Sequence, residues 1–203
     1  MIDRRRDLLR FRVELARILP TIWREILVPA NYSFWDLHVA IQDSMGWLDY
    51  HLHEFRITDR DLEDPVLIGI PSDELWEDLP EVQPGWEIAV IDHLNQPGDQ
   101  AEYEYDFGDG WFHAITLVSI DPRQTGTRYP HCLAGERACP PEDRGGVHGY
   151  HELLEALLDP AHPEHESLGR WIPKSWGPEL FSSDKVRFDN PRRRWEHAFL
   201  SED

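Results

Sequence analysis

Hydrophobic and polar residues alternate along two runs near the start of the chain. The runs are Leu9–Ala16 and Ile22–Val28, and Leu19-Pro20-Thr21 separates them. A period of two is typical of a strand that buries one face. The pattern therefore predicts a first hairpin or a pair of edge strands.

Alternation is clearest around a Gly-Asp-Gly turn inside Tyr103–Val118, which reads YEYDFGDGWFHAITLV. Aromatic and β-branched runs on both sides of such a turn predict a β-hairpin. A two-residue turn would place Asp106 opposite His113, whereas a three-residue loop would pair Phe107 with Trp111. We favour the three-residue loop because it keeps the aromatic residues on one face.

Helical spacing appears in Ser33–Met45, where Ser33 suits the N-cap position and Gly46 is placed to end the helix. Tyr150–Leu158 carries a second apolar stripe of five residues, Tyr150, Leu153, Leu154, Leu157 and Leu158. Glu166–Ile172 and Pro191–Leu200 are weaker helix candidates, the last supported by Asn190 as N-cap.

A further strand is predicted at His51–Ile57. Residues two apart share a face, so His51 and His53 should point toward the core with Phe55 and Ile57.

Together these elements predict one α+β domain over residues 1–203, with a mixed or antiparallel sheet packed against a few helices in the manner of an α/β roll. We expect the Ser33–Met45 and Tyr150–Leu158 helices to pack on that sheet. A variable insertion is expected around residues 58–84, with one apolar run at Val66–Ile70, and a helical extension around 160–203. His131–Gly149 reads as irregular backbone, and Trp86–Leu94 fits either a short strand or a helix.

Composition narrows the class of protein. Among 203 residues, 40% are hydrophobic and 9 are Trp, which favours a packed core over disorder. The net charge of -19 disfavours non-specific nucleic-acid binding and keeps the chain soluble. Neither a signal peptide nor a membrane span is apparent, which predicts a cytoplasmic protein without a membrane partner. The two cysteines are too few for a disulfide framework.

Three motifs in register carry a resemblance to a known family. They are His51-Leu-His-Glu-Phe, the Tyr103–Trp111 stretch, and Cys132–Gly146 followed by Gly149-Tyr150. With this order and spacing the chain resembles the Ri-plasmid (pRi) open-reading-frame-three-like family, whose members are also labelled TnpR-like passenger proteins of insertion elements. The resemblance spans about Phe11 to Phe188.

It implies an α+β fold in bacteria or archaea and no agreed enzymatic activity. Arg144 departs from the pattern because similar sequences often have cysteine there, which weakens a three-cysteine metal site. The acidic chain also lacks the nucleophilic serine among arginines and the basic region that a serine recombinase needs, so the label points to mobile-element neighbours.

Metal-ligating residue types recur in these motifs. His51, His53 and His113 could converge with Asp106 or Asp109 on a divalent metal such as Zn or Mn, or they could be satisfied structural histidines.

A weaker second site would join Cys132 and Cys139 with His131, His148 or His151, but the two cysteines lack Cys-x-x-Cys spacing and could remain unpaired thiols.

Acidic residues supply candidates for catalysis. Glu142 and Asp143 could act as an acid and base pair, with Asp106 and Asp109 as further candidates, or they could cap backbone amides in turns. If the strand at His51 lies near the hairpin, Asp109 at its turn can approach the Pro140–Gly146 loop, which would gather a site at one end of the sheet.

The sequence contains no P-loop, dinucleotide glycine signature or His-Glu-x-x-His motif. We therefore favour a binding or regulatory module with an unknown protein or small-molecule partner. The alternative is a metal-dependent hydrolase or nuclease that uses these His, Asp and Glu residues.

Overall fold

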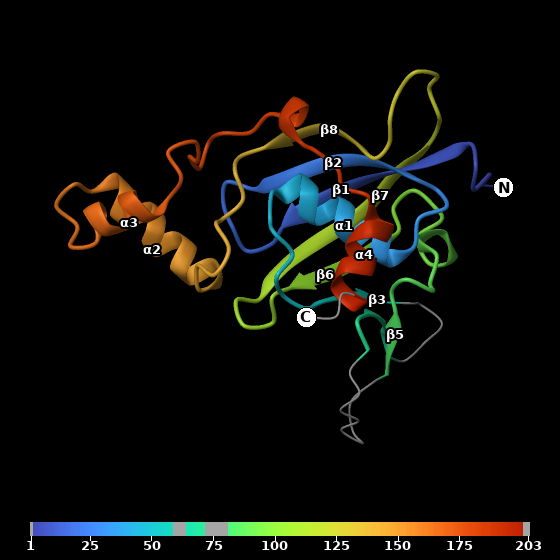
Figure 1. The fold of residues 1–203 in the computed structure, drawn as a ribbon, viewed down its shortest axis with the longest axis horizontal. Coiled ribbons are helices and arrows are strands. Elements are labelled where there is room, and N and C mark those ends of the chain that lie inside the picture. The colour runs from blue at the N-terminus through green and yellow to red at the C-terminus, as the bar shows by residue number, and fades with distance from the viewer. Residues whose placement is uncertain (1, 59–63, 72–80, 201–203) are drawn as a thin grey trace.

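The structure is a computed structural model that describes residues 2–58, 64–71 and 81–200. One eight-stranded sheet organises them, in the order β5-β4-β3-β6-β7-β1-β2-β8 (Figure 1). Neighbouring strands are antiparallel except β4 and β5. The strands are β1 Asp7–Leu15, β2 Ile22–Pro29, β3 His53–Ile57, β4 Val66–Gly69, β5 Val82–Pro84, β6 Gln100–Tyr105, β7 Trp111–Pro122 and β8 His131–Glu136. The helices are α1 Phe34–Met45, α2 Gly146–Leu158, α3 His165–Trp171 and α4 Pro191–Leu200, with 3-10 turns η1 Val90–Asp92 and η2 Ser183–Lys185. The predicted α+β class with a mixed sheet is confirmed.

The first hairpin forms as predicted, because β1 and β2 pair antiparallel from Leu8 opposite Pro29 to Leu15 opposite Ile22. Alternate residues of β1 are fully buried on the side that faces α1, among them Phe11. The other face of this sheet carries ion pairs such as Arg12 with Glu14. One face of the sheet therefore supplies the core, as its two-residue period indicates.

Helix α1 begins and ends where its sequence predicts. The Ser33 side chain accepts a hydrogen bond from the Asp36 amide while the Asp36 carboxylate accepts one from the Ser33 amide, which is a capping box. Gly46 ends the helix at φ 87°, a conformation that glycine adopts without strain. Ten of its side chains are buried, so α1 supplies the other half of the core.

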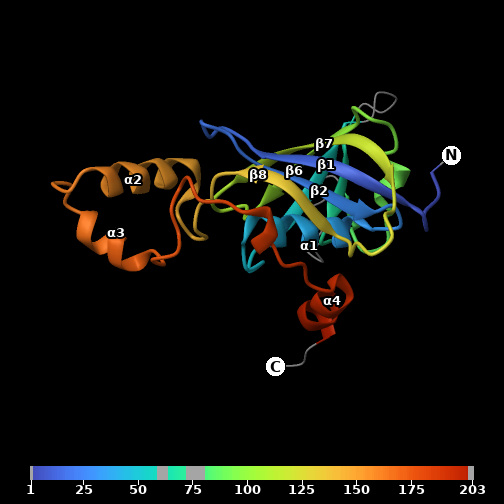
Figure 2. The ribbon, with the colours of Figure 1, turned by 90° about the horizontal axis from the view of Figure 1, so that it is seen from above.

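Helix α4 lies on the same side of the sheet as α1, and α1 is between α4 and the sheet (Figure 2). Asn190 caps α4 as predicted, because its side-chain oxygen accepts hydrogen bonds from the amides of Arg192 and Arg193. Arg194 of α4 then binds Asp43 of α1 at 2.7 Å. The C-terminal helix is thus attached to the core helix by an ion pair.

Helix α2 departs from expectation. It starts at Gly146 rather than Tyr150, and with α3 it lies beyond one end of the sheet instead of across its face (Figures 1 and 2). Leu158, expected in the buried stripe, is 84% exposed, whereas Tyr150, Leu153 and Ala156 are buried. The expected packing of this helix on the sheet is therefore wrong, because its short buried stripe covers only the end of the core.

The β6–β7 hairpin keeps the predicted faces but not the predicted register. Tyr105 pairs with Trp111 and Tyr103 with His113, which is shifted by two residues from the three-residue loop. A shift of two leaves every side chain on its predicted face. Phe107 is the exception, because the strand ends at Tyr105 and Phe107 is 52% exposed in the loop.

Two further segments need correction. The strand at His51–Ile57 is shorter than predicted, so His53 shares the buried face with Phe55 whereas His51 lies outside the strand. The segment His131–Gly149 is not wholly irregular, because β8 pairs with β2 along its first part. The Gly and Pro residues of this segment indicated turns, and its strand has little apolar alternation by which it could be recognised in the sequence.

Part of the predicted insertion belongs to the sheet. Strands β4 and β5, within residues 58–84, form one edge of it. Residues 59–63 and 72–80 of that insertion, and 201–203 of the predicted C-terminal extension, lie outside the described residues. Trp86–Leu94, for which strand and helix were both open, contains the short turn η1.

Candidate functional site

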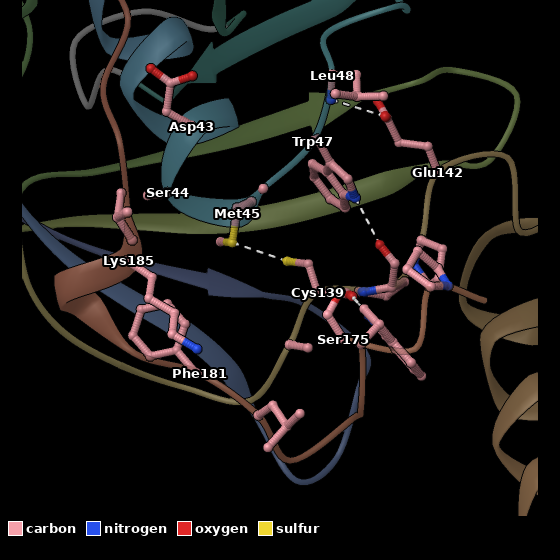
Figure 3. A pocket seen from close by; sticks show the side chains of 18 of the residues that line it. Asp43, Ser44, Met45, Trp47, Leu48, Cys139, Glu142, Ser175, Phe181 and Lys185 are labelled. Atoms are coloured by element: carbon pink, nitrogen blue, oxygen red, sulfur yellow. Dashed lines mark hydrogen bonds between the residues drawn. The ribbon is translucent and has the colours of Figure 1, made fainter.

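At the end of the sheet nearest α2, the link from α1 to β3 crosses the segment of residues 138–142. The link from α1 to β3 starts at Trp47, whose indole donates a hydrogen bond to the carbonyl of Pro140 at 2.8 Å. The next residue, Leu48, donates its amide to Glu142 Oε2 at 2.9 Å (Figure 3). The other carboxylate oxygen, Oε1, accepts the Tyr105 hydroxyl at 2.6 Å. Both oxygens of Glu142 are therefore occupied in holding the crossing together.

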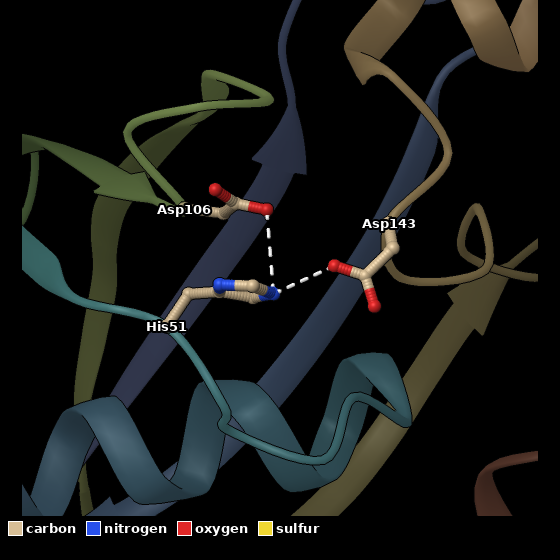
Figure 4. A group of neighbouring side chains, drawn as sticks. All are labelled: His51, Asp106 and Asp143. Atoms are coloured by element: carbon tan, nitrogen blue, oxygen red, sulfur yellow. Dashed lines mark hydrogen bonds and ion pairs between the residues drawn. The ribbon is translucent and has the colours of Figure 1, made fainter.

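Beside this crossing, the imidazole of His51 lies between two carboxylates (Figure 4). Its Nε2 atom is 2.9 Å from Asp143 Oδ1 and 3.5 Å from Asp106 Oδ2. One ligand atom from each of the three residues lies within 4.8 Å of the others. Among the described residues this is the group of His, Cys, Asp and Glu side chains that could hold one metal ion.

Asp106 is fixed by its own loop. Its backbone adopts φ 56°, and its Oδ1 atom accepts hydrogen bonds from the amides of Gly108 and Asp109 at 3.0 and 3.2 Å. The Asp106 amide in turn donates to the carbonyl of Leu52, one residue after His51. These bonds end strand β6 and leave Oδ2 directed at the imidazole.

Asp143 is placed by the contact between two loops. Asp109 Oδ2 accepts the Gly145 amide at 3.0 Å, as expected from an approach of the hairpin turn to the Pro140–Gly146 loop. Gly146 packs so closely that a Cβ atom there would lie 2.2 Å from the carbonyl oxygen of Asp109. Asp109, a candidate ligand by sequence, therefore acts as a clamp between the loops.

The chemistry of the three side chains suits a divalent cation. One imidazole and two carboxylates match the donor preferences of Zn, Mn and Fe. Ligand atoms about 2.1 Å from a tetrahedral ion lie roughly 3.4 Å apart. The 3.5 Å between His51 and Asp106 is close to this value, whereas the 2.9 Å between His51 and Asp143 has to widen when an ion binds. The Asp143 side chain is 69% exposed, so solvent reaches the site directly.

The other two predicted histidines lie in the core. His53 stacks on His38 with ring centroids 3.5 Å apart, and its Nδ1 atom has no hydrogen-bond partner among the described residues. Burial and the neighbouring His38 lower the pKa of His53 well below its ordinary value. His113 is fully buried, and burial lowers its pKa to about 4. The structure thus brings His51 to Asp106 and Asp143, but places His53 and His113 apart from this group.

The two cysteines are separate buried thiols. Cys132 lies on β8, whereas Cys139 Sγ approaches Met45 Sδ at 3.2 Å beneath α1. Burial raises the pKa of each thiol to about 11, so both are protonated near neutral pH. No group of three metal-ligating side chains within the described ranges includes either cysteine.

Sequence reasoning missed a series of buried, hydrogen-bonded polar side chains in the core. Gln42 donates to the Tyr103 hydroxyl oxygen at 2.8 Å, which leaves that hydroxyl able to donate to His38 Nδ1 at 2.9 Å. The opposite nitrogen of His38 then donates to Asp49 at 2.8 Å. Burial alone would raise the pKa of Asp49, but His38 and Arg194 outweigh it and lower that pKa. His38 at the edge of the apolar face of α1 was the visible sign of this series.

Arg24 was also missed, although its position carried a signal. Within the alternating run of β2 it has the same phase as Ile22 and Ile26, so an arginine stands on the core face. The structure shows it 1% exposed. A charged residue in the buried phase of a strand needs a specific partner or a ligand.

Helices long and apolar enough to cross a bilayer are absent from the described part of the chain. Comparison with known proteins gives three matches. A sequence profile described as "Plasmid pRiA4b ORF-3-like protein" matches residues 7–185. The chain is 37% identical over 170 residues to "Uncharacterized protein y4hQ" of Sinorhizobium fredii, which covers 83% of this chain and 82% of that protein.

The fold of this chain is similar to the crystal structure of the protein of unknown function MM3350 from Methanosarcina mazei Go1. The TM-score is 0.80 and the identity 39%, and the match covers 90% of this chain and 99% of the other. None of these three matches carries the TnpR-like label.

Proposed function

The chain belongs to the plasmid pRiA4b ORF-3-like family, and we propose that it is a binding module whose site at His51, Asp106 and Asp143 takes one divalent cation, Mn²⁺ or Zn²⁺. The observation that carries this proposal is the meeting of one imidazole nitrogen and two carboxylate oxygens within 4.8 Å of one another. The three residues come from three distant segments of the chain.

Preorganisation supports the proposal. The Oδ1 atom of Asp106 is held by two amides, so the carboxylate does not have to be ordered when an ion arrives. Bonds of this kind to the outer oxygen of a ligand orient it and tune the metal. The net charge of -19 adds a field that attracts cations to the surface.

The test begins with protein purified without a His-tag, because a tag would bind the same metals. Elemental analysis and equilibrium dialysis with Mn²⁺ and Zn²⁺ should give one bound ion per chain. The variants His51→Ala and Asp143→Asn should each weaken binding more than about 100-fold, since loss of an outer-shell partner alone costs about 10- to 100-fold.

A matched control is available on helix α2. His148 is 3.3 Å from Glu152 and forms an exposed histidine-carboxylate pair away from the site. His148→Ala and Glu152→Gln should bind the ion as the unmodified chain does. Equal affinities in His51→Ala and His148→Ala would refute the proposed site.

A metal-dependent hydrolase is the second candidate, favoured by the number of protein ligands. Three ligands leave coordination positions for water and substrate, as in catalytic zinc sites. The exposed side chain of Asp143 leaves that side accessible. Phosphodiester, nucleotide and peptide substrates should be incubated with the protein under Mn²⁺, Mg²⁺ and Zn²⁺. Turnover abolished by His51→Ala but kept in His148→Ala would establish the hydrolase; a metal-loaded protein without turnover would leave the binding module.

Three expectations from the sequence stay predictions. They are a cytoplasmic location, an unknown protein or small-molecule partner, and a link to insertion elements. The net charge continues to disfavour a nuclease over other hydrolases, because a phosphate backbone would be repelled outside the immediate reach of the cation.

A further inference from the structure

A cavity of about 740 Å³ lies between the end of α1, the 138–142 segment and residues 171–187 of the C-terminal segment. This volume falls within the range of about 300 to 1,000 Å³ that small-molecule sites occupy. Figure 3 shows Lys185 and Phe181 on one side, with Trp47 and Cys139 across from them. The cavity is distinct from the proposed cation site, although Glu142 in its wall precedes Asp143 in the chain.

Aromatic side chains line part of the wall, and two of them are held in place by hydrogen bonds. Trp47 donates its indole hydrogen to the Pro140 carbonyl, and Trp176 donates its own to the Cys139 carbonyl at 2.9 Å. With its indole N–H bonded to the protein, the half-buried Trp176 can offer apolar ring surface to a ligand, whereas Trp47 is buried and stacked on Tyr105. Phe181 completes an aromatic lining that suits a flat apolar group.

Arg24 lines this cavity with its charge unbalanced. Its Nε donates to the Ser44 carbonyl at 2.8 Å, and its Nη1 donates to the carbonyls of Trp23 and Glu136. The guanidinium also lies over the Phe181 ring at 3.8 Å. Among the described residues no carboxylate forms an ion pair with it, and Nη2 makes no hydrogen bond. A buried guanidinium that is hydrogen-bonded only to neutral carbonyls keeps its positive charge unneutralised. That charge favours the binding of an anion.

Charge elsewhere in the wall points the same way. Both oxygens of Asp43 are already bonded, to Arg194 and to the Asp189 amide, and both oxygens of Glu142 hold the crossing described above. Lys185 has no ion-pair partner within the described part of the chain. In a protein with a net charge of -19, a cavity with cations to spare is an exception to the overall field.

We propose that this cavity binds a small organic anion, with a flat apolar body against the Trp176 and Phe181 side chains and an acidic group near Arg24 Nη2 and Lys185. Carboxylate and phosphate share the chemistry that these cations recognise. The binding would be independent of the divalent cation, so it is measured on metal-free protein in chelator-free buffer and fails or succeeds separately from the metal site.

Three naphthalene compounds test the acidic half of the ligand on a constant apolar ring. 2-Naphthoate and 2-naphthyl phosphate carry the charge, whereas 2-naphthamide has the same ring without it. Quenching of Trp fluorescence, checked by calorimetry, should show saturable binding of at least one anion about tenfold tighter than the amide. The tighter of the two anions identifies the acidic group. Equal affinity of all three compounds, or no saturable binding at millimolar concentration, would overturn the proposal.

The two lysines of the chain provide a matched pair of variants. Lys185 lines the cavity, whereas Lys174 is exposed nearby but does not line it. Lys185→Met should weaken binding of the preferred anion about tenfold, and Lys174→Met should leave it unchanged. Arg24→Met should weaken binding further where the variant folds.

Chemical labelling gives a second measurement that needs no variant. The bound anion should protect Lys185 from acetylation, detected by mass spectrometry, while Lys174 is acetylated at its original rate. Equal acetylation of both lysines with and without saturating anion would contradict the proposed position of the acidic group.

Discussion

Replacing Gly146 by alanine should separate the two loops that bring Asp106 and Asp143 together. Gly146 has φ +66°, and an added Cβ would lie 2.2 Å from the backbone carbonyl oxygen of Asp109. Ordinary contact begins near 3.4 Å, so the loops must move apart by about an ångström. Because the obstacle is backbone rather than the end of a flexible side chain, a rotamer change cannot relieve it.

Two costs set the magnitude. An L-residue at positive φ loses about 1 kcal/mol relative to glycine. Opening the gap also breaks the bond from the Gly145 amide to Asp109 Oδ2, worth about 1 kcal/mol. Gly146→Ala should therefore lower the free energy of unfolding by about 2 kcal/mol. Moving Asp143 away from Asp106 should also weaken Mn²⁺ binding by about tenfold or more.

Gly126→Ala is the matched control. Gly126 has φ +86°, yet a Cβ there would meet nothing within 4 Å. This variant should lose only the conformational cost of about 1 kcal/mol and keep the affinity for Mn²⁺. Urea unfolding and equilibrium dialysis measure the two quantities. Equal destabilisation of the two variants, or unchanged metal affinity in Gly146→Ala, would refute this account of the loop contact.

Two further predictions concern buried charge. Stability should fall as pH drops from about 6.5 to 4, because burial keeps the folded pKa of His113 near 4 and that of His53 well below its ordinary value, while the unfolded chain takes up protons. His113 alone accounts for a loss of about 3 kcal/mol in the free energy of unfolding at pH 4. The free energy of unfolding should therefore fall less with decreasing pH in His113→Gln than in the unmodified chain. Parallel curves for the two proteins would contradict this prediction. Arg194→Met should cost about 2 to 3 kcal/mol by leaving the buried Asp43 unpaired. The control Arg192→Met, in an exposed pair on the same helix, should change the free energy of unfolding in urea by less than about 0.5 kcal/mol. Similar losses in both variants would show that the Arg194–Asp43 ion pair does not attach α4 to the core.

The sequence was informative wherever a local signal decided the structure. The two-residue period of β1 and the capping box at Ser33 depend on neighbours within a few positions, and both elements formed as predicted. The hairpin register was less accessible. Binary pattern distinguishes the faces of β6 but not a shift of two residues, and the strand ended early because Asp106 turned its side chain back onto the amides of its own loop.

Elements decided by distant partners were harder to predict. Strand β8 has glycine at position 135, where a Cβ would lie 2.7 Å from the Trp23 carbonyl oxygen. In the sequence that glycine signals a turn, whereas in the structure it permits close pairing with β2. Helix α2 likewise shows an apolar stripe in sequence, but only part of it has a surface to bury against.

The candidate site depends on both kinds of information. Its residue types were visible in the motifs, and the approach of Asp109 to the Pro140–Gly146 loop was anticipated, but their roles were not, because Asp109 clamps the loops while Asp143 faces His51. Asp106 and Asp143 both adopt positive φ, at 56° and 55°. Asparagine tolerates this conformation about as well as aspartate, so the backbone alone does not require a carboxylate at either position. A negative charge facing the imidazole is what aspartate adds. For that reason Asp143→Asn separates the two roles: a turn residue would survive the change, whereas a metal ligand would lose its ion.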